Sequence, residues 1–349
     1  MIEKTRELVL RHGWNATAYQ LVNPGITLWF PKDGEAVIGY VRRHHTRVVA
    51  GAPVADLDRL PTLVHEWESL SAKSHDRVCY FGAAGRIREL LEGHQGYSTV
   101  VLGAQPVWNP QRWAENSSRV PSLRQQFNRA RNKGVVVEEW PIERANGNPA
   151  LHRVLDQWLD TRGLPPLHFL VEPQTLSLLE GRRVFVASVH GEVVGFLVAS
   201  PIPVRSGWLT EQFVRGWAAP NGTVELMVDF AIRSMAASGS TYVTMGLVPL
   251  SSQGAPKPVG NPVWLAWLMA WVRAHGRRFY NFSGLEAFKA KFRPDYWEPI
   301  YAISNEPRFS FRTLYAIAAA FTKSPPLVAV AKGMLRALRQ EVKWLVKGR

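Results

Sequence analysis

The chain has 349 residues, 46% of them apolar and 20% charged, so it can bury a sizeable core and exceeds one ordinary domain of ~100–150 residues. Lys and Arg total 42 against 28 Asp and Glu, and this net charge of +14 favours a polyanionic partner, either nucleic acid or an anionic membrane surface. Cys79 is the only cysteine, which excludes an intrachain disulfide, a Cys-based zinc site and an iron–sulfur cluster. No signal-peptide core opens the chain and no window approaches ~20 uninterrupted apolar residues, which indicates a cytoplasmic protein.

Short apolar runs alternate with helical periodicity in the first third of the chain, as is typical of α/β and α+β proteins. Helices are predicted at residues 2–12, 60–74 and 86–92. Strands are predicted at residues 17–30, 36–42, 46–51, 78–81 and 97–102. A junction follows near residues 110–125.

A second series of elements repeats this order. Helices are predicted at residues 150–161, 223–237, 263–275 and 284–291. Strands are predicted at residues 183–190, 193–200, 208–217, 241–246, 278–283 and 299–304. Three strands, a helix, a strand, a helix and a strand is the order of the N-acetyltransferase fold. We therefore predict an α/β (α+β) protein of two tandem acetyltransferase-like (GNAT-type) domains, residues 1–118 and 119–306, followed by a tail at 307–349.

The junction contains a predicted basic helix at residues 119–134. Pro121 and Ser122 open this helix and Gly134 closes it. Its basic residues, with no acidic residue among them, are Arg119, Arg124, Arg129, Arg131 and Lys133. The helix could bind nucleic-acid phosphates, or it could be a solvated connection between the two domains.

A turn at Pro220-Asn221-Gly222 separates a strand from a helix. The free N–H groups of such a helix N-terminus suit an anion or a developing oxyanion. The turn has one glycine and a proline, which argues against the glycine-rich loop that closes on the pyrophosphate of coenzyme A. Glu225 and Asp229 lie one turn apart on the helix and could hold an ammonium group or act as a base. The alternative for both is charge complementarity with the helix dipole, which is the favoured interpretation for Asp229.

The segment 279–299 combines aromatic and basic residues. A strand is expected to run into a helix at Ser283, with Glu286 three residues later completing a capping box. Lys289, Lys291 and Arg293 follow among aromatic residues, as suits a phosphate or a nucleotide base. The alternative is an aromatic core with lysines on its outside.

The tail carries nine basic residues and one acidic residue between Pro307 and Arg349. Its apolar residues at helical spacing are Leu327, Val330, Met334, Leu335, Leu338, Val342 and Leu345. Basic residues take much of the other side, which predicts a basic amphipathic helix suited to a membrane interface. A helix packed on the body of the protein is the alternative.

Several motifs together resemble those of a known family. The most specific runs from Phe279-Tyr280-Asn281-Phe282-Ser283-Gly284-Leu285 through Phe288-Lys289-Ala290-Lys291-Phe292 to Trp297-Glu298-Pro299. The supporting motifs are His12-Gly13-Trp14-Asn15, Gly34 to Tyr40, Leu123 to Arg131, Pro220-Asn221-Gly222 with Glu225, and Gly246 to Ser251. Over residues 10–305 the chain resembles the C-terminal catalytic domain of aminoacyl-phosphatidylglycerol synthases, also called multiple peptide resistance factors.

The resemblance implies transfer of an amino acid from aminoacyl-tRNA to a lipid hydroxyl, commonly that of phosphatidylglycerol. The second domain, 119–306, would be catalytic, and no cofactor or metal would be needed because the aminoacyl ester is already activated. The basic tail would hold the protein on the inner face of the cell membrane, and no obligate protein partner is evident. Family members usually carry an N-terminal membrane-embedded flippase ahead of this domain.

The expected site residues fall into three groups. The catalytic candidates are Glu225, Lys289 and Lys291. The substrate-binding candidates are Arg215, Asn221, Asp229, Tyr280, Asn281 and Arg293. The tRNA-binding candidates are Arg124, Arg129, Arg131 and Lys133.

Three other functions are compatible with these patterns. A peptidoglycan-type transferase would use aminoacyl-tRNA on a peptide amine, but does not by itself require an amphipathic tail. An acyl-CoA-dependent N-acyltransferase is opposed by the Pro220-Asn221-Gly222 turn. A peripheral RNA- or membrane-binding protein without activity is opposed by the clustering of Lys289, Lys291 and Glu225.

Overall fold

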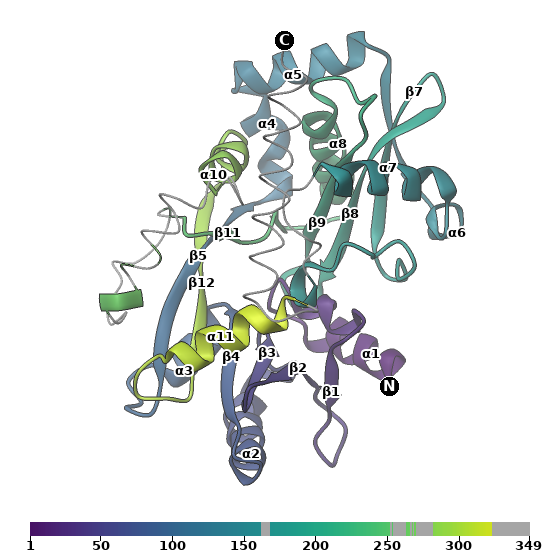
Figure 1. The fold of residues 1–349 in the computed structure, drawn as a ribbon. Coiled ribbons are helices and arrows are strands. Elements are labelled where there is room, and N and C mark those ends of the chain that lie inside the picture. Colours follow the sequence, from purple (N-terminus) through teal and green to yellow (C-terminus); the bar gives the residue numbers. More distant parts are fainter. Residues whose placement is uncertain are drawn as a thin grey trace, which may run out of the picture.

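The computed structural model describes residues 1–161, 168–251, 253, 263–265, 267, 269 and 282–322. Within these ranges the strands form one mixed sheet of twelve strands (Figure 1). From one edge to the other the strands are β1 (Thr27–Trp29), β2 (Ile38–Arg43), β3 (Thr46–Ala50), β4 (Arg77–Ala83), β12 (Tyr296–Ser304), β5 (Ser98–Trp108), β10 (Tyr242–Thr244), β9 (Gly207–Arg215), β8 (Glu192–Ile202), β7 (Arg183–Val189) and β6 (Val135–Trp140). The short strand β11 (Val248–Pro249) pairs with β5 beside this path.

Helices cover both faces of the sheet in each half of the molecule. Successive residues of β3, such as Val48 and Val49, belong to different core clusters because successive side chains of a strand point to opposite faces of the sheet. In the first half, α1 (Ile2–His12) and α11 (Phe311–Ala320) pack on one face, and α2 (Leu60–Lys73) and α3 (Gly85–Leu91) on the other. In the second half, α4 (Trp113–Ser118), α5 (Pro121–Asn132), α8 (Thr223–Ala237) and α10 (Phe282–Ala290) share one face, and α7 (Pro149–Asp160) covers the other.

Strand β12 joins the two halves. It comes late in the sequence, yet it lies between β4 and β5 and runs antiparallel to both (Figure 1). On the far side of β5, β10 of the second series pairs with Val107 and Trp108. The strands of both series therefore form one continuous sheet. The domain boundary predicted after residue 118 stays a prediction.

The acetyltransferase-like order of elements is confirmed in the first series, which reads β1, β2, β3, α2, β4, α3 and β5. In the second series β7, β8, β9, α8 and β10 follow the predicted order, and α10 and β12 match the helix and strand predicted last. The helix at 263–275 and the strand at 278–283 between them lie mostly outside the described residues. The basic helix is also confirmed, as α5, and Gly134 beyond its end has a positive φ of 77°.

Three details of the sequence prediction are wrong. Residues 17–30 do not form one strand, because Ala18–Val22 is a 3₁₀ helix with every residue buried and only Thr27–Trp29 is extended. A continuous buried run does not distinguish a strand from a helical turn by periodicity. Ser283 is the second residue of α10 and does not cap it, so residues 282 and 283 are helical where a strand was predicted, while 278–281 lie outside the described residues. Strand β6 was missing from the prediction.

Other predictions fall wholly or partly outside the described residues. The helix predicted at 263–275 is helical at 263–265, 267 and 269. Tyr280, Asn281 and residues 323–349 of the tail lie outside the described part of the chain. The described part of the tail contains α11, which packs on β2 and β3.

A buried polar cluster ties β12 to the second half. The Glu298 carboxylate on β12 accepts two hydrogen bonds from the Arg205 guanidinium, at 2.8 and 2.6 Å. It also accepts hydrogen bonds from Gln105 on β5 and from the Tyr242 hydroxyl on β10. Burial alone would raise the pKa of Glu298, but these donors outweigh it and lower the pKa below its ordinary value.

We expect Glu298→Ala to lower the free energy of unfolding by about 3 kcal/mol, because it leaves the Arg205 charge buried without a partner. The matched control Glu192→Ala removes an exposed carboxylate and should cost less than about 0.5 kcal/mol. Because the pKa of Glu298 is lowered in the folded state, its contribution is present above the ordinary Glu pKa and disappears as the pH falls through the lowered value. Chemical denaturation at pH 7 and pH 4 measures both effects, and equal costs for the two variants at pH 7 would contradict them.

Candidate active site

The candidate site is centred on an ion pair between α8 and the end of α10. Lys291 Nζ donates to Glu225 Oε1 at 2.5 Å. The Lys291 ammonium also lies over the rings of Phe288 and Phe292, at 4.3 and 5.4 Å from their centroids. The Lys291 side chain is 31% exposed and that of Glu225 14% exposed, so the pair is open to solvent on the Lys291 side.

The turn before α8 places Glu225 in the first turn of this helix. Gly222 has a φ of 95°, and a Cβ atom there would lie 2.2 Å from the carbonyl oxygen of Gln126 on α5. Only glycine fits both the backbone angle and this close approach. The contact fixes the start of α8 against α5, and Glu225 follows three residues later.

Lys289 is buried behind the ion pair, with 4% of its surface exposed. Its Nζ donates to the carbonyl oxygens of Met245, Gly246 and Leu247, at 2.6, 2.9 and 3.3 Å. Burial lowers the pKa of Lys289 to about 7. The residue thus anchors α10 to the loop after β10, and its predicted catalytic role stays a prediction.

Asp229 lies one turn beyond Glu225 and is 2% exposed. Its Oδ1 accepts hydrogen bonds from Trp113 Nε1 and Arg233 Nε, both at 2.9 Å. Its Oδ2 lies 3.8 Å from Arg131 of α5. The carboxylate therefore connects α4, α5 and α8.

Three of the remaining predicted substrate-binding residues are exposed at the ends of described elements. Arg215 is exposed at the end of β9, and Asn221 is exposed in the turn before α8. Arg293 is exposed two residues after Lys291 and has a positive φ of 48°. The roles of these residues, and of Tyr280 and Asn281 outside the described ranges, stay predictions.

The predicted tRNA-binding residues are exposed on α5 and, for Lys133, just after its end. Leu123, Phe127 and Ala130 are buried against the core. The exposed basic residues of this segment are Arg124, Arg129, Arg131 and Lys133. The helix thus presents a solvated basic surface whose nucleic-acid partner stays a prediction.

Sequence reasoning missed the aromatic support of the site. Trp113 on α4 stacks on Phe292 with ring centroids 6.1 Å apart. The Trp108 indole donates to the carbonyl oxygen of Phe292 at 2.9 Å. Trp108 lies 184 residues before Phe292, and both tryptophans belong to the first series of elements. The only sequence signal for this contact is the occurrence of two tryptophans close together near residue 110.

The described residues contain neither a metal-binding cluster nor a membrane-spanning helix. In that part of the chain, no group of three or more His, Cys, Asp and Glu side chains is arranged to hold a metal ion. Among the described helices, none combines the length and apolar character needed to cross a bilayer.

Comparison with known proteins identifies the family. The model of the family described as phosphatidylglycerol lysyltransferase, C-terminal, matches residues 6–304. The chain belongs to this family. Its fold agrees with that of L-PGS from Bacillus licheniformis, with a TM-score of 0.73 and 21% identity over 95% of each chain.

Two curated relatives of this family member are much longer. The chain is 24% identical to the lysylphosphatidylglycerol biosynthesis bifunctional protein of Rhodococcus jostii, over 90% of this chain and 28% of the relative. It is 22% identical to the phosphatidylglycerol lysyltransferase of Bacillus subtilis, over 85% of this chain and 34% of the relative. The chain therefore spans about a third or less of the length of these relatives.

We expect Lys289→Met to change the pH dependence of stability. The native state releases the Lys289 proton near pH 7, whereas the unfolded chain keeps it up to the ordinary pKa of 10.5. Below pH 7 both states are protonated, so wild-type stability rises relative to the variant between pH 7 and pH 10. Chemical denaturation at pH 6, 8 and 9.5 measures this rise, with Lys73→Met on the exposed side of α2 as control. A wild-type-to-variant difference that does not change with pH would refute it.

Proposed function

We propose that this protein transfers an amino acid from aminoacyl-tRNA to the hydroxyl group of a membrane lipid, with phosphatidylglycerol as the acceptor. The observation that carries the proposal is the accessible Glu225–Lys291 ion pair in a member of the phosphatidylglycerol lysyltransferase family. The name of the Bacillus subtilis relative supports phosphatidylglycerol as acceptor and lysine as the transferred group.

The pair supplies the two charges that acyl transfer needs. The lipid hydroxyl oxygen attacks the ester carbonyl, and the bond from the carbonyl carbon to the tRNA ribose oxygen breaks. Glu225 would accept the hydroxyl proton, and the Lys291 ammonium would stabilise the oxyanion and return a proton to the ribose oxygen. Glu225 could instead hold the α-ammonium group of the amino acid. The ester is already activated, so positioning and charge stabilisation account for the reaction.

The donor is proposed from the basic surface of α5. Arg124, Arg129, Arg131 and Lys133 are exposed on the helix that contacts Gly222, which lies three residues before Glu225. Phosphates bound along this surface would bring a charged RNA end toward the ion pair. The same contact opposes an acyl-CoA donor, because α5 packs directly on the turn that would have to close on a pyrophosphate.

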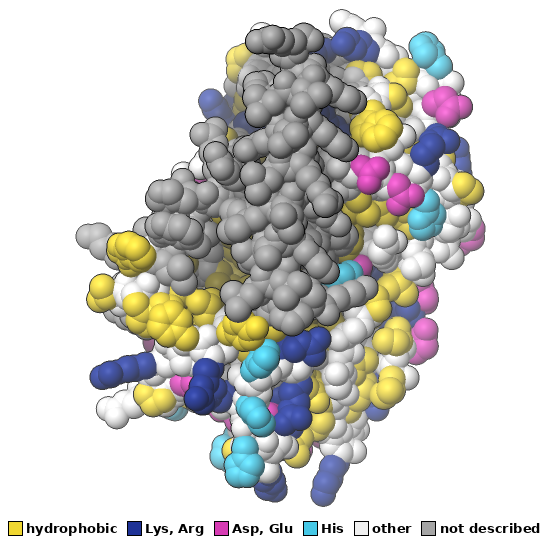
Figure 2. Space-filling model, viewed as in Figure 1, with side chains coloured by type: hydrophobic (Ala, Val, Ile, Leu, Met, Phe, Trp, Pro, Cys, Tyr) yellow, Lys and Arg dark blue, Asp and Glu magenta, His cyan; other side chains and the backbone are white. Residues whose placement is uncertain are grey.

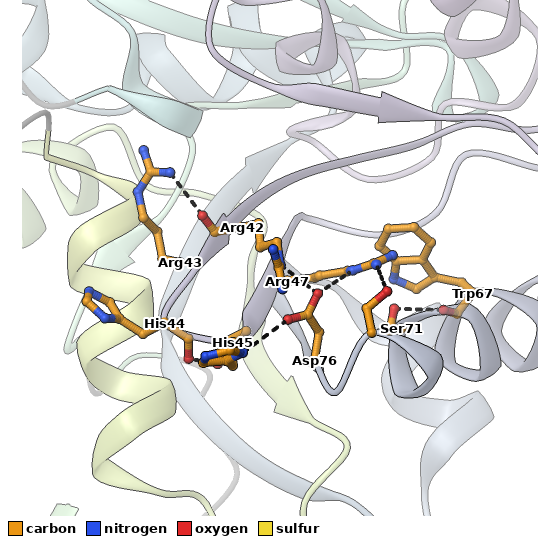
Figure 3. A network of polar contacts seen from close by, with 10 residues as sticks. Arg42, Arg43, His44, His45, Arg47, Trp67, Ser71 and Asp76 are labelled. Atoms are coloured by element: carbon orange, nitrogen blue, oxygen red, sulfur yellow. Dashed lines mark hydrogen bonds and ion pairs between the residues drawn. The ribbon is translucent and has the colours of Figure 1, made fainter.

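The acceptor side is proposed from the end of the sheet that carries β2, β3 and α11. Figure 2 shows Lys, Arg and His side chains gathered at the lower end of the molecule. Figure 3 shows the turn between β2 and β3, where Asp76 accepts hydrogen bonds from Arg42 and Arg47, at 2.7 and 3.0 Å. Arg43 donates to the backbone oxygens of Arg42 and Ala319, and no ion pair with a carboxylate is found for it within the described residues. Together with the basic tail at 307–349, this surface would hold the protein against anionic lipid.

The direct test combines purified protein, anionic liposomes and total tRNA charged with a radiolabelled amino-acid mixture. We expect label in the chloroform-extractable lipid, and we expect RNase treatment of the tRNA to abolish it. The labelled lipid identifies both the amino acid and the acceptor. Label found on a peptide amine, or activity with acyl-CoA in place of charged tRNA, would contradict the proposed reaction.

We expect Glu225→Gln to lower the rate of this transfer at least 100-fold, because it removes the base while keeping the size of the side chain. The control Glu143→Gln changes an exposed carboxylate on the short helix Ile142–Ala145 and should keep the wild-type rate. Unfolding curves of both variants should match the wild type. Full activity of a folded Glu225→Gln protein would remove Glu225 from the mechanism.

A further inference from the structure

A hollow of about 250 Å³ lies between α5, β6 and α8, beside the candidate site. Its apolar walls come from Val135, Val137, Leu226 and Phe230. Its polar lining consists of Arg131, Asp229 and Arg233. This is smaller than the ~300–1,000 Å³ of pockets for drug-sized ligands, so it suits a single flat ring system.

Asp229 Oδ2 keeps hydrogen-bond acceptor capacity, on a side chain that is 3% exposed and lines the hollow. Oδ1 is occupied by Trp113 and Arg233. Oδ2 accepts no hydrogen bond among the described residues, and Arg131 at 3.8 Å is too distant to donate one. A lining carboxylate oxygen with free acceptor capacity selects a ligand that carries N–H donors.

The two arginines make the mouth of the hollow positive. The Arg131 and Arg233 side chains are 55% and 48% exposed, and the single Asp229 carboxylate lies between them. Phe230, 36% exposed, adds an aromatic face. Apolar walls, an aromatic ring, guanidinium planes and a carboxylate are the groups that hold an unstacked RNA base.

Arg131 also belongs to the exposed basic surface of α5, with Arg124, Arg129 and Lys133. A strand whose phosphates follow this surface would reach the hollow directly. We favour RNA over a lipid as the polyanion here, because Phe230 offers a ring on which a base can stack and Arg131 continues the exposed basic surface of α5.

We propose that this hollow binds one unstacked base of a single-stranded RNA end and prefers a base with an exocyclic amino group. The inference rests on the proposed function, in which aminoacyl-tRNA is the donor. Cytosine or adenine would donate its amino group to Asp229 Oδ2, stack on Phe230 and place its phosphate at Arg131 and Arg233. Uracil places two carbonyl oxygens beside its single N–H, and the carboxylate repels them.

The position of the hollow fits the proposed reaction. Asp229 follows Glu225 by four residues on α8, a rise of about 6 Å along the helix axis. A base held at Asp229 would therefore bring the sugar at the end of the strand near the Glu225–Lys291 pair. The hollow would set the register of the RNA end, and the ion pair would act on its ester.

The test measures binding of cytidine, adenosine and uridine tetraribonucleotides to the purified full chain at one salt concentration. We expect the cytidine or adenosine oligomer to bind about fivefold more tightly than the uridine oligomer. Val137 is a half-buried residue of β6 that lines the hollow, and Val137→Phe fills it. This change should lower the affinity for the cytidine and adenosine oligomers to that for the uridine oligomer. Phe230→Ala removes an exposed stacking ring and should reduce the preference without affecting the fold.

Arg124→Ala is the matched control, because Arg124 lies on the same helix but does not line the hollow. Arg124→Ala should weaken the binding of all three oligomers equally and leave the preference among them unchanged. Equal affinity for the three oligomers, or an unchanged preference in folded Val137→Phe and Phe230→Ala proteins, would overturn the inference. If the wild-type protein still transfers amino acids from tRNA to lipid, only the inference fails. If the preference is found but no transfer occurs, the RNA site stands and the proposed function fails.

Discussion

The insertion of β12 between β4 and β5 is the constraint on which the sheet and the candidate site both depend. Its backbone pairs with two strands of the first series, and its Glu298 side chain pairs with Arg205 of the second. A strand that is buried on both edges and holds an ion pair cannot move without breaking both kinds of bond. The two halves of the chain are therefore fixed to one another through this strand.

The same strand positions the cationic side of the site. Lys291 lies five residues before β12, and Phe292 between them is buried against Trp108 and Trp113. The backbone reverses at Arg293 and then pairs with β5. Glu225 is positioned separately, by the close contact of Gly222 with α5 three residues before it. The ion pair is thus formed by two segments that are held separately in place.

Burial of Lys289 is the energetic cost of this arrangement. Its amine is surrounded by backbone oxygens and by no carboxylate in the hydrogen bonds of the described residues, and its pKa falls to about 7. Lys289 therefore acts as a structural anchor of α10, and its catalytic role stays a prediction. The adjacent Lys291, accessible and paired with Glu225, is the better placed of the two to touch a substrate.

Sequence reasoning reached the order of elements because the apolar runs, the turns at Pro220-Asn221-Gly222 and Gly134, and the helix periods are local signals. It also selected Glu225 and Lys291, which the structure brings together over 66 residues. It could not place β12 between two strands of the first series, since strand order depends on long-range pairing. It could not identify Trp113 as a partner of Asp229, because nothing local distinguishes a tryptophan that packs on a site from one in an ordinary core. Arg233, the other partner, lies four residues after Asp229 on the same helix, and this local signal was overlooked. The strand predicted at Ala18–Val22 was wrong for a third reason. A fully buried turn shows no alternation of apolar and polar residues that would distinguish it from a buried strand.

We propose that Glu225 and Lys291 act as one unit in aminoacyl transfer. A double-mutant cycle on kcat/KM tests it, with Glu225→Gln, Lys291→Met and the two changes together in the liposome assay. Residues that act as a unit are strongly non-additive, so the account predicts that the double variant loses little more activity than either single variant. Losses that multiply, as for independent residues, would contradict the account and assign the two side chains to separate tasks.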